Sequence, residues 1–255
     1  MATFDLMRKF GIAPDDPKVV IATDAFPRHY KYYAMLVDDR QISTFDSIVG
    51  RCFKQVLVGQ GRSSIFGREH MSHSVEKRPF RDFVWKRAGL PARPVFTSFN
   101  VLFVQKNPTG AENPTRWDNL DQVVDDVKRA RPHWNVSSIS WLGMPLVEQV
   151  RRTHGTNAFV SLPGTDVING FFLPDNSGLI MPCRFDAHAY EGKGGLHESW
   201  EVDAIFSTMP WITTIQFCDG VVTNVGRVMT VDSPTILHVL DSFFESGPIW
   251  KGSER

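Results

Sequence analysis

The turn at residues 163–166, Pro-Gly-Thr-Asp, is the segment of this sequence with the clearest chemical potential. It follows an apolar run and precedes a short stretch of helical character at 167–173. In an open parallel sheet, ligands bind outside the carboxyl ends of the strands, and free backbone N–H groups at a helix start can hold a diphosphate. The alternative is that Gly164 only permits a tight turn and Asp166 only caps a helix. The residues expected to bind a ligand here are Gly164, Thr165, Asp166 and Asn169.

Three cations lie where they could complete this anion site. Lys106 directly follows the apolar run at 101–105, and Arg116 comes ten residues later, at the end of a polar loop. Arg184 lies just past another apolar run at 178–183. Lys and Arg stabilise the negative charge that develops on a leaving diphosphate. We therefore expect Lys106, Arg116 and Arg184 to contribute to the same site as the 163–166 turn.

The strands and helices that position these residues are predicted most clearly in the second half of the chain. Short apolar runs at 101–105, 135–141, 158–162 and 178–183 predict buried strands. Amphipathic stretches at 119–131 and 145–153 predict intervening helices. A last helix is expected to open at Pro234, with Ser233 as its cap, as Asp118 is the expected cap of the first helix. Strands that alternate with helices predict an α/β fold with a Rossmann-like parallel sheet.

The first half gives a weaker pattern. Runs at 18–23 and 55–59 predict strands, and stretches at 27–39 and 80–89 predict helices. The proline-containing segment 91–100 separates the halves, so we expect an N-terminal α/β half at 1–95 and a C-terminal Rossmann-like half at 96–255. The glycine-rich residues 186–204 are expected to form an extended loop.

In its second half the chain resembles glycosyltransferase family 61. The matching pieces are residues 101–105, 146–150, 160–166 and 169–174, and the segment 80–91 also resembles the stretch that precedes this region in the family. The resemblance implies a GT-B-like arrangement of two Rossmann-like domains, here with a shortened N-terminal half. It also implies an inverting transfer of a hexose or pentose from a nucleotide-sugar, UDP-linked in our expectation, to a glycan or glycoprotein.

The sequence departs from the family at the turn. The family has a His-Gly-Ala turn, whereas this chain has Pro163 before Gly164, so the histidine is missing. This departure and the short first half leave open a second hypothesis, a non-catalytic binding or scaffold protein with a degenerate transferase fold.

Transfer to a hydroxyl also requires a proton acceptor. Asp24 follows the 18–23 run and His29 begins the predicted 27–39 helix, so either could face an interdomain cleft. The alternative is that Asp24 caps that helix and His29 lies on the surface. We expect no metal and no cofactor beyond the nucleotide-sugar co-substrate, because the histidines at 188 and 197 lack a diagnostic spacing.

Composition excludes several other classes of protein. Lys and Arg total 28, as do Asp and Glu, so the net charge of +0 argues against a nucleic-acid-binding protein. The basic segment 62–93 is expected to be a solvated face with Phe83 and Trp85 turned inward. No apolar run reaches the ~18 residues of a membrane helix, and no signal-peptide core opens the chain. Three cysteines without metal spacing favour a reducing compartment, so we expect a cytoplasmic or soluble intracellular protein.

Overall fold

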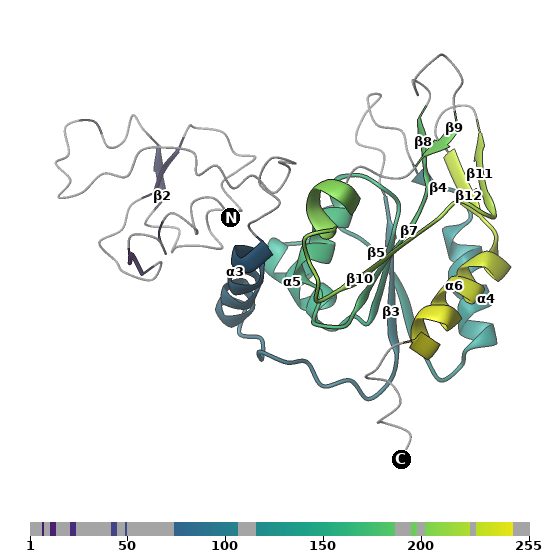
Figure 1. Ribbon diagram of the computed structural model, residues 1–255, viewed down its shortest axis with the longest axis horizontal. Helices are drawn as coiled ribbons and strands as arrows, with labels where there is room; N and C mark the ends of the chain where they lie inside the picture. The colour runs from purple at the N-terminus through teal and green to yellow at the C-terminus, as the bar shows by residue number, and fades with distance from the viewer. Residues whose placement is uncertain are drawn as a thin grey trace. The chain divides into compact units, whose positions relative to one another are not determined.

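Figure 1 shows the computed structural model of the chain, which divides into two compact units, Met1–Leu90 and Pro91–Arg255. The residues that the structure describes are 7, 11–13, 21–23, 42–44, 49, 74–106, 116–186, 195–197, 202–224 and 228–246. Asp24, His29, the predicted 27–39 helix and the predicted 55–59 strand lie outside them. In the first unit, β1 (Ile21–Thr23) pairs in parallel with β2 (Ile42–Thr44), and α3 spans Ser74–Arg87.

The second unit is built on a five-stranded sheet in which every neighbouring pair is parallel. The sheet has the order β10-β7-β6-β3-β5 and comprises β3 (Asn100–Gln105), β5 (Asn135–Ser140), β6 (Ala158–Ser161), β7 (Gly178–Pro182) and β10 (Thr213–Phe217). All residues of β6 and β7 are buried, as expected for central strands covered on both faces. The predicted α/β, Rossmann-like fold is confirmed, and the four predicted strands are neighbours. The GT-B-like placement of the two units stays a prediction.

Helices cover both faces of this sheet (Figure 1). On one face lie α4 (Leu120–Ala130) and α6 (Ser233–Ser246), on the other α5 (Leu146–His154) and the 3₁₀-helix η4 (Thr165–Phe172). The α4 and α6 side chains share a core with alternate residues of β3, which include Val101 and Phe103. Leu102 and Val104 must therefore face the α5 and η4 layer, because successive side chains of a strand point to opposite faces.

The order of connections creates a switch point between β3 and β6. From β3 the chain passes through α4 to β5 on one side, and from β5 it returns through α5 to β6 on the other side of β3. Numbered along the chain, the five strands have the spatial order 2-1-3-4-5 of doubly wound folds. In such folds the ligand crevice lies at the carboxyl ends of the two strands where the connections diverge.

Smaller elements lie beyond the carboxyl edge. A second sheet with the order β11-β12-β4 consists of β4 (Arg116–Trp117), β11 (Val221–Asn224) and β12 (Val228–Val231). The side-chain amide of Gln105 donates to the Trp117 carbonyl at 3.1 Å, which ties β4 to the end of β3. The extended loop predicted at 186–204 is wrong in part, because β8 (Arg184–Asp186) pairs antiparallel with β9 (Gly195–His197) and a π-helical turn, η5, spans Val202–Phe206.

Two predicted helix caps are wrong. No side-chain cap hydrogen bond is made at the start of α4, so Asp118 does not cap it. At α6 the cap is Asp232, whose carboxylate accepts the Thr235 N–H at 2.8 Å. The Ser233 hydroxyl instead donates to Asp126 of α4 at 2.6 Å. Ser233 thus has a tertiary partner on α4, whereas Asp118 pairs with its near neighbour Arg116 at 3.0 Å.

Cys183 and Cys218 form a disulfide with Cα atoms 4.9 Å apart. They follow β7 and β10, and the Cys183 N–H donates to the Phe217 carbonyl at 2.8 Å, so the bond staples two neighbouring strand ends. The expectation that these cysteines stay reduced is therefore wrong.

In the part of the chain that the structure describes, none of the helices has the length and apolar character needed to cross a membrane.

Candidate functional site at the sheet switch point

The switch point brings Lys106 next to the predicted 163–166 turn. The register pairs Val104 of β3 with Ser161 of β6, so Lys106 and Pro163 stand abreast two positions further on. The side chain of Lys106 is only 5% exposed. Its ammonium donates a hydrogen bond to the Pro163 carbonyl at 2.9 Å. A buried cation that is held against a backbone turn therefore marks the carboxyl edge of the sheet.

Gly164 allows this close approach. Its φ angle is +130°, a conformation that residues with a side chain rarely adopt. A Cβ atom built on Gly164 would lie 2.3 Å from the Lys106 Nζ and 3.2 Å from its Cε. Glycine is thus required here both for the backbone conformation and for the room that the ammonium occupies.

Asp166 adds a carboxyl group to the same place. It lies in the first turn of η4, two residues after Gly164. Burial raises the pKa of Asp166 above its ordinary value of 3.8, and the positive charge of Lys106 opposes that rise. A titratable group whose pKa is shifted by burial and by a specific charged neighbour, at a ligand-binding edge, is a candidate functional residue.

Asn169 holds η4 in position. Its side-chain amide donates to Gln149 of α5 at 3.0 Å, and Gln149 in turn donates to the Met144 carbonyl at 2.8 Å. The amide of Asn169 therefore tethers η4 to α5. Its contribution to the site is to fix the helix that carries Asp166.

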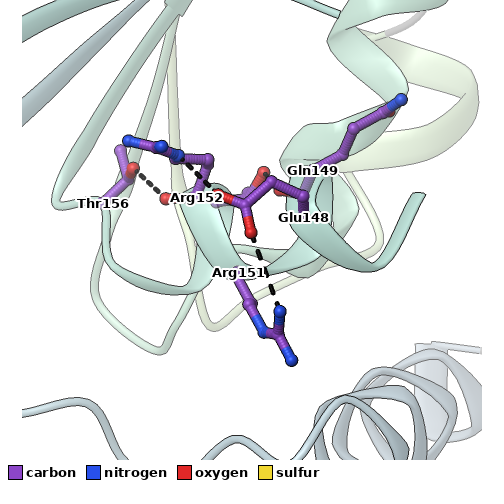
Figure 2. Close-up of polar contacts among 6 residues, drawn as sticks. Glu148, Gln149, Arg151, Arg152 and Thr156 are labelled. Atoms are coloured by element: carbon purple, nitrogen blue, oxygen red, sulfur yellow. Dashed lines mark hydrogen bonds and ion pairs between the residues drawn. The ribbon is translucent and has the colours of Figure 1, made fainter. Parts of the chain in front are cut away.

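The neighbouring residues of α5 have separate roles (Figure 2). Glu148 accepts from Arg152 at 2.9 Å and lies 3.8 Å from Arg151, while the Gln149 side chain points away from this group. The Thr156 hydroxyl donates to the Arg152 carbonyl at 2.7 Å, which closes the end of the helix. Exposed ion pairs of this kind contribute about 0–1 kcal/mol each. Glu148 and Gln149 thus bond to other residues of the second unit.

Among the described side chains, that of Arg116 pairs elsewhere. Arg116 is 52% exposed and pairs with Asp118 at 3.0 Å, although its strand is tied to the end of β3. Thr165 opens η4 and Arg184 opens β8, and the structure describes only the backbone of both. The structure therefore brings together Lys106, Gly164 and Asp166 of the residues expected from the sequence.

A second cluster of basic residues lies on α3. Lys77 and Arg81 are buried one helical turn apart, whereas the sequence predicts a solvated basic face. The Arg81 guanidinium lies 4.2 Å from the centre of the Trp85 ring and pairs with Asp82 at 2.8 Å. Burial lowers the pKa of Lys77 to about 8. Trp85 is buried as predicted, whereas Phe83 is only partly buried. The basic residues 78, 86 and 87 are exposed as predicted, so on α3 the correction concerns Lys77 and Arg81 alone.

No protein-family model matches this chain, and a search of curated proteins finds no match to its sequence. The fold and the geometry at the switch point are therefore the basis for a functional proposal.

Proposed function

We propose that the second unit binds a nucleotide-sugar at the switch point between β3 and β6, and that the chain is a glycosyltransferase. The observation that carries this proposal is the buried Lys106 ammonium beside the Gly164 turn, at the edge where doubly wound sheets bind nucleotides. The resemblance to glycosyltransferase family 61 over the same strands adds independent support.

In this proposal Lys106 stabilises the diphosphate that leaves during sugar transfer. A cation in a site screened from water interacts with a developing negative charge far more strongly than one in bulk solvent. Asp166 would repel a diphosphate if it were ionised beside it. Burial raises the pKa of Asp166, which makes protonation of this carboxyl less costly when the ligand binds. The proposal requires no resident metal or cofactor.

The acceptor in this proposal is a hydroxyl of a glycan or glycoprotein. Its proton would pass to a base contributed by the first unit. Asp24 remains the first candidate and His29 the second, and both lie outside the described residues.

A second candidate function is a nucleotide-binding module without transfer activity. The observation that favours it is that two predicted donor-site residues bond to other residues of the protein. Asn169 donates to Gln149, and Arg116 pairs with Asp118. The missing histidine before Gly164 is consistent with the same hypothesis.

A donor screen separates these functions. The protein is incubated with a panel of UDP- and GDP-sugars, release of nucleoside diphosphate is measured, and binding of UDP and GDP is followed by calorimetry. The transferase proposal predicts binding together with slow donor hydrolysis or transfer. Binding without turnover of any donor would support the binding module, and the absence of binding would contradict both.

A further inference from the structure

We infer that Trp141 is a ligand-binding residue of this site, with its indole N–H donating a hydrogen bond to an oxygen of the phosphate held by Lys106. The inference deepens the proposed function, because it uses the same switch point. In chemical terms, the site binds an oxyanion through two donors, the Lys106 ammonium and the neutral N–H of the Trp141 indole.

The first argument is position. Trp141 directly follows β5, and the register pairs Gln105 of β3 with Ser140 of β5. One residue further along both strands, Trp141 therefore stands abreast of Lys106. The two residues occupy the carboxyl ends of neighbouring strands, and Pro163 stands on the other side of Lys106.

The second argument is the direction of the ring. The Trp141 indole stacks on Phe159 of β6, with ring centroids 6.3 Å apart and an interplanar angle of 14°. Because β5 and β6 flank β3 on opposite sides, these rings can meet only above β3. Phe159 pairs with Leu102 in the register, and Leu102, Val104 and Lys106 alternate onto one face of the sheet. The indole therefore lies over β3 on the face that also carries Lys106.

The third argument is the state of the N–H group. Trp141 is 7% exposed, and its buried Nε1 has no hydrogen-bond partner among the described residues. Buried polar groups are nearly always hydrogen-bonded, so an unpaired donor at a ligand-binding edge calls for an explanation. A ligand oxygen would supply the missing acceptor.

The donor set defines the ligand class. An indole N–H donates and cannot accept, and an ammonium likewise only donates. Two donors of this kind select a group rich in acceptor oxygens, such as a diphosphate.

The structure provides a matched control in Trp134. Its Nε1 is also buried without a partner among the described residues, and its ring packs on Phe99 at 4.8 Å. Trp134 precedes β5, so it lies at the opposite edge of the sheet and in the core shared by α4 and α6. Replacing either tryptophan with phenylalanine removes the N–H and keeps an aromatic ring.

The test is calorimetric titration of Trp141→Phe, Trp134→Phe and the wild-type protein with inorganic pyrophosphate and with UDP. We expect Trp141→Phe to weaken both affinities by about tenfold or more, the scale of a hydrogen bond to a charged group, and Trp134→Phe to leave them unchanged. Equal affinities for wild type and Trp141→Phe would overturn the inference and leave the proposed function standing.

The two failures are distinguishable. Wild-type protein that binds pyrophosphate but no nucleotide contradicts the proposed function, and the Trp141 comparison is then decided with pyrophosphate. Wild-type protein that binds neither overturns both. If Trp141→Phe does not fold, the indole N–H resonance of Trp141, assigned through its contact with Phe159, is followed in the wild-type protein. A downfield shift on addition of pyrophosphate supports the inference, and an unmoved resonance overturns it.

Discussion

Replacing Gly164 with alanine places a methyl group in the space that the Lys106 ammonium occupies. The added Cβ would lie 2.3 Å from Nζ, well inside the contact distance of the two atoms. The ammonium must then move away from the turn and lose its hydrogen bond to the Pro163 carbonyl. Because Lys106 is buried, it has little freedom to find water instead.

The cost has two parts. Holding a residue with a side chain at a φ of +130° costs on the order of 1–3 kcal/mol. Loss of a hydrogen bond made by a charged group costs about 1.5–3 kcal/mol. Gly164→Ala should therefore lower the free energy of unfolding by roughly 2.5–6 kcal/mol, and it should weaken binding at the switch point by displacing the cation.

Urea unfolding of Gly164→Ala beside a matched glycine variant measures this cost. Gly155 ends α5 with a φ of −84°, and a Cβ there would meet atoms only at 3.7 and 3.8 Å. Gly155→Ala is therefore expected to be neutral or stabilising by a few tenths to ~1 kcal/mol. Equal effects of the two substitutions would refute the reasoning.

A double-mutant cycle with Lys106→Met isolates the steric part. Methionine lacks the terminal ammonium, so in that background Gly164→Ala should retain mainly the backbone strain of ~1–3 kcal/mol. If the cost of Gly164→Ala is the same in both backgrounds, the Lys106 ammonium is not the group that the methyl displaces.

Three further predictions follow from charge and from covalent structure. Because burial raises the pKa of Asp166, Asp166→Asn should increase the free energy of unfolding at pH 7. This gain should vanish below pH 3.8, where the wild-type carboxyl is protonated in both the folded and the unfolded state. A gain in stability that persists in acid would show that burial of the charged carboxyl is not its cause. Burial lowers the pKa of Lys77 from 10.5 to about 8, so the folded state releases its proton before the unfolded state does. The free energy of unfolding should therefore rise as the pH rises from 8 to 10.5. Urea unfolding of Lys77→Met over the same pH range should show no such rise. The Cys183–Cys218 disulfide joins residues 35 apart, so replacing both cysteines with serine should lower the free energy of unfolding by ~4 kcal/mol. An unchanged denaturation midpoint of the double variant would contradict a stabilising disulfide.

The central strands of the fold could be predicted because they are continuous apolar runs. The β3, β6 and β7 strands are buried almost throughout, and a strand covered on both faces needs such a sequence. The edge strand β10, Thr-Thr-Ile-Gln-Phe, is only partly buried and has no such signature, so the sequence does not predict it. The β4 strand has two residues, too few to carry a periodic pattern.

The parts of the site could be predicted, but not their contact. Lys106 and Gly164 each follow a predictable strand, so both were expected at the carboxyl edge. Their contact depends on β6 lying beside β3 instead of beside β5, and no local pattern specifies strand order. The burial of Trp141 across β3 depends on the same order, although an aromatic residue at the end of the predicted 135–141 strand is a visible signal.

The most direct test of the central claim is calorimetric titration of UDP into wild-type protein and Lys106→Ala. If the Lys106 ammonium holds a phosphate at the switch point, its removal should weaken UDP binding by ~1–3 kcal/mol while the variant keeps its far-ultraviolet circular dichroism. Gly155→Ala, with the site untouched, should bind UDP as the wild-type protein does. Equal UDP affinity of wild type and a folded Lys106→Ala would place nucleotide binding elsewhere and contradict the account.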